Sequence, residues 1–233
     1  MKLIRFNDRI FYSEYEEERD RPAIGYLKGK AFSLAVEAGH SRLHINEFYD
    51  ALNREGLPLP SLTVLTHWHW DHSFALNWIN GLSVASSISN RHLRDFIAQR
   101  SPKNDQEFFH LDPSIEKEYS QNVELEVVTA DIEYQNELHI DAGEMPIDIF
   151  RVTSPHTDDC SLICLPEDNV VFFGDAMSGV FPTWIPDTGK LQEFIKTVEN
   201  IDARCFIGGH WPIFTKEELI KELYSSLEEY SSK

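Results

Sequence analysis

Short apolar runs bounded by polar turns alternate along the chain with longer segments in which apolar residues recur every three or four positions. The short runs predict buried strands, and the longer segments predict helices with one apolar face. The expected strands cover residues 3–6, 10–13, 23–27, 31–36, 61–66, 82–85, 123–128, 137–140, 147–152, 161–165, 170–173 and 204–207. The expected helices cover residues 41–54, 73–79, 90–99, 191–200 and 216–230. This alternation favours an α/β fold with helices packed outside a sheet.

Two polar stretches interrupt the pattern. Residues 14–22 carry a dense run of charges, which predicts a solvated turn or loop. Residues 100–121 are polar and poorly periodic, with only scattered aromatic residues. A long loop of this kind either covers a substrate pocket or is an ordinary surface loop, and the sequence pattern is compatible with both structures. His110, which lies in this stretch, is expected to be solvated.

The closest grouping of candidate metal ligands follows the strand expected at 61–66. His67, His69, Asp71 and His72 place three imidazoles and one carboxylate within six positions. In extended chain His67 and His69 point to the same side, and a turn into a helix aims the other two at the same volume. Imidazoles mixed with carboxylate suit zinc, iron or manganese, whereas an all-thiolate set indicates structural zinc or an iron–sulfur cluster. Ordinary surface or interior histidines are a poor explanation for four ligand types this close together.

The segment from His67 to His72 resembles the signature of the metallo-β-lactamase superfamily, His-any-His-any-Asp-His, which also follows a strand in that family. Three later motifs resemble the rest of the family pattern, in order. They are a Ser-Pro-His-Thr segment containing His156, an apolar strand running into Gly-Asp at Asp175, and a Gly-Gly-His segment ending at His210. At the family's first acidic position, usually Asp, this chain has Glu37. The resemblance covers roughly residues 20 to 212.

This resemblance implies a four-layer αββα sandwich of the metallo-β-lactamase type, with the metal site at one edge of the two sheets. It also implies two divalent ions, with zinc the expected metal and manganese or iron as alternatives. The implied ligands are His67, His69 and His156 for one ion, Asp71, His72 and His210 for the other, and Asp175 between them. Asp71 is also expected to steer the nucleophile or the leaving-group proton, which gives it a catalytic role.

The function implied by the resemblance is that of a dinuclear metal-dependent hydrolase. Two ions about 3.5–4 Å apart hold a bridging hydroxide at neutral pH, which would cleave a small ester, thioester, lactone or phosphoester. One alternative is a mononuclear non-haem iron oxygenase of the same fold, which resembles use of only His67, His156 and Asp175. A second is a non-catalytic metal-binding member, which is normally recognised by lost ligands. Because every ligand position is filled here, we favour the hydrolase.

Further residues near these motifs have expected supporting roles. Glu37, Thr66 and Thr157 are candidates for hydrogen bonds that orient the metal ligands. Cys160 is expected to be a small buried side chain and not a nucleophile. Trp184 is expected either to line an apolar pocket beside the site or to belong to the core.

Composition narrows the classes of partner and compartment. The net charge of −18 disfavours nucleic acid, because that affinity depends on neutralising phosphates with Lys and Arg, and it leaves a small-molecule substrate as the expected partner.

The length of 233 residues, with 42% hydrophobic residues, fits a single domain over 1–233. Cys160, Cys164 and Cys205 form no C-x-x-C pair, which predicts free thiols in the cytoplasm. No signal peptide or membrane span is expected, and the pattern leaves the oligomeric state open.

Overall fold

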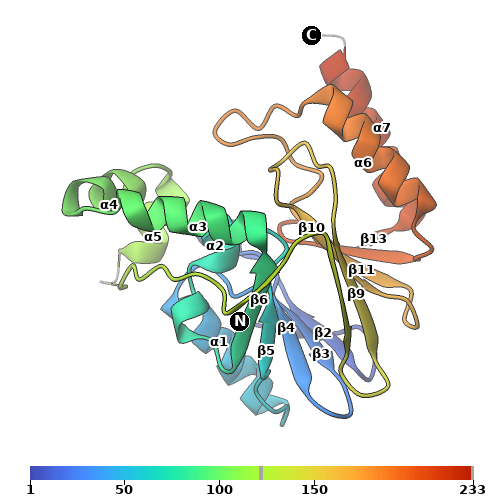
Figure 1. The fold of residues 1–233 in the computed structure, drawn as a ribbon, viewed down its shortest axis with the longest axis horizontal. Helices are drawn as coiled ribbons and strands as arrows, with labels where there is room; N and C mark the ends of the chain where they lie inside the picture. The colour runs from blue at the N-terminus through green and yellow to red at the C-terminus, as the bar shows by residue number, and fades with distance from the viewer. Residues whose placement is uncertain (121–122, 232–233) are drawn as a thin grey trace.

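Two mixed sheets pack face to face in the computed structural model, which describes residues 1–120 and 123–231, and helices cover the outer face of each sheet (Figure 1). The first sheet has the order β1 (Leu3–Arg5), β2 (Ile10–Ser13), β3 (Gly25–Lys28), β4 (Ser33–Val36), β5 (Leu62–Val64), β6 (Leu82–Ser86) and β7 (Ile132–Tyr134). The second has the order β13 (Phe214–Thr215), β12 (Cys205–Gly208), β11 (Val170–Gly174), β10 (Ser161–Leu165), β9 (Pro146–Arg151) and β8 (Glu137–Asp141).

Parallel strand pairs decide where the loops of interest lie. In the first sheet β4, β5, β6 and β7 run parallel, with α1 (Arg42–Arg54) and α3 (Ser87–Gln99) in the crossovers. In the second sheet β11 and β12 run parallel. The carboxyl ends of parallel neighbours lie at the same edge of a sheet, so the segments that follow them meet there. These are the segments that carry most of the candidate ligands.

Three apolar layers fill the spaces between these elements. Between the sheets, Val36 and Val64 of the first sheet belong to the same buried cluster as Ile163 and Phe172 of the second. A second cluster lies outside the first sheet under α1 and α3, and a third lies outside the second sheet under α6 (Thr188–Asn200) and α7 (Lys216–Ser231). This arrangement is the predicted four-layer αββα sandwich, and the prediction is confirmed.

The helices begin and end where the sequence signals them. Ser41 accepts hydrogen bonds from the backbone N–H groups of Leu43 and His44 and so caps α1. The helix buries Phe48 and Leu52, and the chain leaves it through a glycine at positive φ. The predicted helix at 41–54 is therefore confirmed almost to the residue.

The segment 100–121 was expected to be irregular, and that expectation is wrong for its described part. It forms α4 (Pro102–Phe109) and α5 (Pro113–Tyr119), whereas Gln121 lies outside the described residues. Each helix starts with a capping side chain, Ser101 or Asp112, followed by proline. Two helices this short contain too few turns to show apolar periodicity, so the sequence analysis did not recognise them.

Three other predicted elements need correction. Residues 123–128 form no strand. Val127 is buried in the cluster outside the first sheet, and the strand that pairs with β6 is β7, further along. The helix expected at 73–79 is split into α2 (Trp70–Ser73) and the 3₁₀ turn η2 (Leu76–Trp78). The charged run 14–22 contains the 3₁₀ turn η1 (Glu17–Arg19), and its Arg21 is buried, not solvated.

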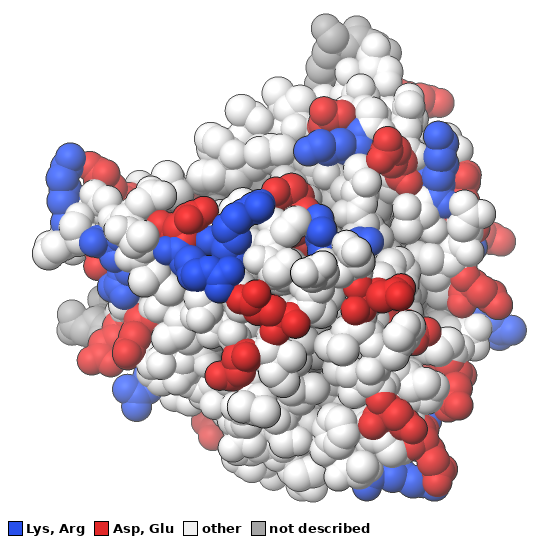
Figure 2. All heavy atoms as spheres, viewed as in Figure 1, with Lys and Arg blue, Asp and Glu red and all other residues white. Residues whose placement is uncertain are grey.

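On the face shown in Figure 2, basic side chains gather over α3 and carboxylates surround them. Arg91 and Arg94 of this helix pair with Asp158 and Glu133 at 3.1 and 2.7 Å. Much of the positive charge on this face is therefore neutralised locally. Among the described residues, no helix combines the length and the apolar composition that crossing a membrane requires.

Candidate metal centre

The candidate ligands reach one place from both sheets. His67, His69, Asp71 and His72 follow β5, in the loop that leads into α2 and in α2 itself. The others come from the second sheet: His156 from the loop between β9 and β10, Asp175 from the end of β11, and His210 from just after β12. All seven residues predicted from the sequence are brought together, in two adjacent groups.

The first group, here called the histidine group, consists of His67, His69 and His156. Nε2 of His156 lies 2.9 Å from Nδ1 of His69 and 3.3 Å from Nε2 of His67. All three rings are buried. Burial, together with the neighbouring imidazoles, lowers the pKa of His67 well below its usual range and that of His69 to about 3. The rings of His67 and His69 are therefore neutral at physiological pH, and their nitrogens lie close to Nε2 of His156, an arrangement that suits a divalent cation.

The second group, here called the mixed group, consists of Asp71, His72, Asp175 and His210. Asp71 Oδ2 lies 2.8 Å from His210 Nε2 and 3.1 Å from His72 Nε2. Asp175 lies 3.4 Å from the same nitrogen of His72 and 3.5 Å from that of His210. The rings of His67 and His72, with centroids 4.2 Å apart, place this group next to the histidine group.

The protonation states of the residues in the mixed group depend strongly on one another. Burial opposes a charge on His210, but the carboxylates of Asp175 and Asp71 outweigh it and raise its pKa to about 9. Burial likewise opposes ionisation of Asp175, yet His210 and His72 lower its pKa to about 2. Two buried carboxylates thus require positive partners, a role that a divalent cation fills as well as a protonated imidazole.

Glu37 connects the strand β4 to this site. It accepts hydrogen bonds from the backbone N–H and the hydroxyl of Thr66, and its Oε1 lies 3.1 Å from His72 Nδ1. Thr66 Oγ1 lies 3.1 Å from His67 Nδ1. On the far side of the site, His156 Nδ1 lies 2.8 Å from the carbonyl of Gly179, which directs its Nε2 toward the ligands. Both Glu37 and Thr66 are therefore placed to orient ligands, as expected.

Thr157 and Cys160 are placed differently from the ligands. The Thr157 hydroxyl donates to Asp159 at 2.6 Å and lies 3.2 Å from Cys160 Sγ, so it orients a buried carboxylate outside the seven predicted ligands. Burial raises the pKa of Cys160 to about 12, which keeps the thiol protonated. The structure therefore gives Cys160 the inert, buried place that was expected.

Two glycines explain why the later motifs contain Gly-Asp and Gly-Gly-His. Gly174 has φ +52°, and a Cβ there would collide with Oγ1 of Thr66. A Cβ on Gly209 would collide with Oδ1 of Asp175 and with the ring of His72. The backbone of the second sheet thus approaches the ligands of the first too closely for any side chain.

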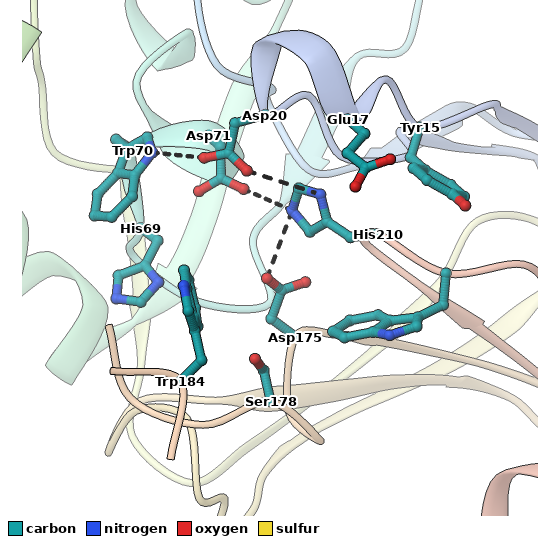
Figure 3. A pocket seen from close by; sticks show the side chains of 11 residues that line it. Tyr15, Glu17, Asp20, His69, Trp70, Asp71, Asp175, Ser178, Trp184 and His210 are labelled. Carbon is teal, nitrogen blue, oxygen red and sulfur yellow. Dashed lines mark hydrogen bonds and ion pairs between the residues drawn. The ribbon is translucent and has the colours of Figure 1, made fainter. Parts of the chain in front are cut away.

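A pocket of about 300 Å³ opens over the two groups (Figure 3). Trp184, which is 47% exposed, forms one wall, with its ring parallel to that of His156 at a centroid distance of 6.2 Å. Trp184 is therefore a pocket residue and not a core residue. The pocket is lined by Tyr15, Glu17, Asp20, His69, Trp70, Asp71, Asp175, Ser178, Trp184, His210 and Trp211. None of these comes from the described part of 100–121, where Phe108 and Tyr119 pack into the core.

Asp20 is a site residue that sequence reasoning missed. Its Oδ2 accepts a hydrogen bond from Trp70 Nε1 at 3.0 Å, and its Oδ1 lies 4.0 Å from His210 Nδ1 (Figure 3). Burial and the charge of Asp71 raise its pKa to about 7. His40 Nδ1 lies 3.0 and 3.1 Å from the carbonyls of Arg19 and Asp20 and so anchors this turn. Within a run of charges, no local pattern distinguishes Asp20 from its solvated neighbours.

Residues 39–214 match the family model of the metallo-beta-lactamase superfamily. The chain belongs to this superfamily. Superfamily membership and the two buried groups of histidines and aspartates together support the binding of divalent metal. The resemblance drawn from the sequence is thereby confirmed.

Solved structures of the superfamily share the fold. DIM-1 metallo-beta-lactamase is 17% identical, with a TM-score of 0.70 over 98% of this chain and 97% of that chain. A metallo-beta-lactamase from Pontibacter korlensis is 13% identical, with a TM-score of 0.67 over 97% and 98%. A metallo-beta-lactamase family protein from Thermus thermophilus is 13% identical, with a TM-score of 0.68 over 98% and 81%. At these identities the likeness shows the fold, and the chemistry must be argued from the site.

Proposed function

We propose that this superfamily member is a metal-dependent hydrolase that holds two divalent ions, with zinc favoured, and cleaves a small ester, thioester, lactone or phosphoester. The observation that carries the proposal is the convergence of two buried ligand groups at the base of one pocket. The histidine group would hold one ion, and Asp71, His72 and His210 the other, with Asp175 between them. Bound ions of this kind supply a hydroxide at neutral pH and stabilise negative charge on an attacked carbonyl or phosphoryl group.

The protein's own residues would supply orientation, proton handling and a dry pocket. Glu37 and the Gly179 carbonyl fix the rings of His72 and His156, so the ligand nitrogens need no rearrangement. Asp71 lines the pocket, and we assign it the role of holding or moving a proton of the nucleophile or leaving group. Trp70 and Trp184 form apolar walls that limit water around the reacting bond.

The mixed group separates this proposal from an iron oxygenase of the same fold. Such an oxygenase would use only His67, His156 and Asp175. Here the buried Asp71 and His72 and the partly exposed His210 lie beside them, within ligand distance of one another. A second ion has a complete set of imidazole and carboxylate ligands, which supports a dinuclear hydrolase.

Metal content and hydrolysis measured on the same sample test the proposal. Freshly purified protein is expected to contain two zinc or manganese ions per chain and to cleave esters or phosphoesters in a manner that chelation abolishes and metal restores. His210→Ala should lose one ion and most activity, whereas His139→Ala, on an exposed strand position, should retain both. A single iron without hydrolysis would favour the oxygenase, and the absence of bound metal would overturn the proposal.

A further inference from the structure

We infer that the pocket selects a substrate that carries a positively charged amine or ammonium group, which binds at the part of the pocket lined by Glu17, Tyr15 and Trp211. The inference rests on the proposed hydrolase function and narrows its substrate class to cationic esters or lactones. In Figure 3, Glu17 and Tyr15 lie at the end of the pocket away from His69. A substrate whose reacting bond lies at the ligands would place its distal group at this end.

The charge of the pocket wall is the first argument. Its lining contains the carboxylates of Glu17, Asp20, Asp71 and Asp175, and the lining residues of the described chain include no Lys or Arg. A neighbouring hollow of about 530 Å³ shares Tyr15, Glu17 and Trp211 with the pocket, and its described lining also contains no Lys or Arg. A substrate with a phosphate or carboxylate tail would find no lysine or arginine in the described lining of either place.

The second argument is that Glu17 retains an unneutralised carboxylate. Asp71 and Asp175 belong to the proposed metal site, and Asp20 is engaged by Trp70. Glu16, before Glu17, pairs with Arg21 at 3.3 Å, and Glu18, after it, pairs with Lys117. Within residues 1–120 and 123–231, no side-chain hydrogen bond or ion pair engages the exposed Glu17 carboxylate, so its charge is available to a ligand in the pocket.

The third argument is the aromatic side chains that line the pocket together with this carboxylate. Tyr15 is 39% exposed, and Tyr15 and Trp211 line both the pocket and the neighbouring hollow with Glu17. Faces of tyrosine and tryptophan attract ammonium groups through the ring quadrupole, and a nearby carboxylate adds to that attraction. Aromatic rings with a carboxylate and no lysine or arginine thus make a cation site and a poor anion site. The net charge of −18 also favours the approach of a cation over that of an anion.

In the reaction, the acyl carbon–oxygen bond of the ester breaks, water supplies the new oxygen of the acid, and the alcohol leaves with a proton. The cationic group takes no part in these steps. It positions the ester, so its removal lowers the specificity constant without changing the chemistry.

Matched pairs of esters test this inference. The metal-loaded enzyme is given acetylcholine, its longer-chain homologues, and uncharged esters in which a quaternary carbon replaces the nitrogen. For the homologue of best length we expect kcat/KM to exceed that of the uncharged ester by roughly 5- to 30-fold. Glu17→Gln should reduce this ratio toward one, and Glu18→Gln, which alters the neighbouring carboxylate paired with Lys117, should retain it.

A binding measurement separates this inference from the proposed hydrolase function. Choline, its homologues and the matching uncharged alcohols are titrated against tryptophan fluorescence in wild type and Glu17→Gln. If neither ester is cleaved but choline binds better than the uncharged alcohol, and only through Glu17, hydrolysis of such esters is contradicted and the cation site stands. Equal binding of choline and the uncharged alcohol overturns the cation site, whatever the hydrolysis result. Preferred binding of an anionic alcohol would overturn it as well.

Discussion

Two carboxylates beside the metal centre occupy unusual backbone conformations. Asp20 and Glu37 have φ values of 51° and 75°, a region that few residues other than glycine adopt. Each points its carboxylate at a histidine of the mixed group, Asp20 at His210 and Glu37 at His72. Such conformations persist where the surrounding structure holds them, and they cluster at functional sites. The direction of these two side chains is thus set by backbone strain in the turns that carry them.

Removing the charge of Asp20 should weaken metal binding without unfolding the protein. In Asp20→Asn the amide can still accept from Trp70, but the negative charge facing His210 is lost. We expect roughly 10- to 100-fold weaker binding of the second metal ion, measured by competition with a chromophoric chelator. Asp8→Asn, which changes a fully exposed carboxylate, is the control and should leave the affinity unchanged. An unchanged affinity in Asp20→Asn would remove Asp20 from the site.

Gly174→Ala should destabilise the protein more than the strain of its backbone explains. The added Cβ would collide with Thr66, which holds Glu37 and His67. Gly56→Ala is a matched control, since Gly56 also has positive φ but its Cβ would meet open space. We expect about 1–2 kcal/mol loss for Gly56→Ala and roughly 1–3 kcal/mol more for Gly174→Ala, measured by urea unfolding. If the two variants lost the same amount of stability, the structure around Thr66 would have accommodated the added Cβ without further cost.

The buried histidines make the stability of the chelator-treated protein depend on pH. His69 has a folded pKa of about 3, whereas in an unfolded chain it titrates near 6.5. Between these values the unfolded chain binds more protons, so stability falls as the pH drops, by at most about 1.4 kcal/mol per pH unit for each such group. His210, with its pKa raised to about 9, acts in the opposite sense, and its contribution is lost as the pH rises from about 6.5 through 9.

Thermal unfolding of chelated protein across this range checks the prediction. The melting temperature should be highest near neutral pH and fall on both sides. His69→Gln should flatten the acid side of the profile, whereas His139→Gln, at an exposed position, should leave that side unchanged. A profile that is equally steep in His69→Gln and wild type would contradict the assignment.

At the residue scale, the convergence of the candidate ligands was predictable because each belongs to a short motif that resembles the family pattern. His67 to His72 form one segment, and Asp175 and His210 each follow a glycine. Asp20 and His40 were not predictable, because their roles depend on contacts with residues far along the chain. The spacing of residues along the sequence does not reveal contacts of this kind.

Among the elements, the 3₁₀ turn η1 and the helix α5 are packed together beside the pocket. Arg21, just after η1, donates to both carboxylate oxygens of Glu118 in α5, at 2.8 and 3.1 Å, and both side chains are buried. Ser41, the cap of α1, also donates to Glu118. One buried ion pair therefore fixes α5, the start of α1 and the turn that carries Glu17 and Asp20.

Breaking this ion pair should destabilise the protein and disturb the pocket. Glu118→Gln removes the one fully buried counter-charge of Arg21 and leaves it only the partly exposed carboxylates of Glu16 and Glu47, which should cost up to about 3 kcal/mol in urea unfolding. Lys117→Met removes the neighbouring exposed pair with Glu18 and should cost at most about 1 kcal/mol. If both variants lost the same small amount, the Arg21–Glu118 pair would not hold α5 in place.

Most of the elements that the sequence mispredicted are short. Long helices and fully apolar strands were found because their patterns repeat, as in α1 and β11. The short helices α4 and α5 and the strand β7 offer only one or two turns or three residues of pattern. Their structure is set by packing, for example of Phe108 against Trp70 and Phe74, which no local pattern reveals.

For the whole molecule, the main consequence is that the ligands join two sheets. The histidine group takes two rings from the segment after β5 and one from the second sheet, and the mixed group also draws on both. A bound ion should therefore act as a cross-link between the sheets. With metal at about 1,000 times its dissociation constant, the folded state should gain about 4 kcal/mol, seen as a rise in melting temperature. His139→Ala should show the same rise and His67→Ala a much smaller one. If added metal did not change the melting temperature, the proposed cross-link between the sheets would be contradicted.

The two sheets also divide the chain without interleaving. Strands β1 to β7 build the first sheet in chain order and β8 to β13 build the second, with only residues 135–136 between the two sets. A cut at that point would give two fragments, each with its own hydrophobic layers and each with an incomplete set of ligands. Neither fragment alone would carry both ligand groups, and mixing the fragments would restore the groups only when the two sheets associate. Under the proposed function, hydrolysis by the mixed fragments would therefore report that the two halves of the chain have associated.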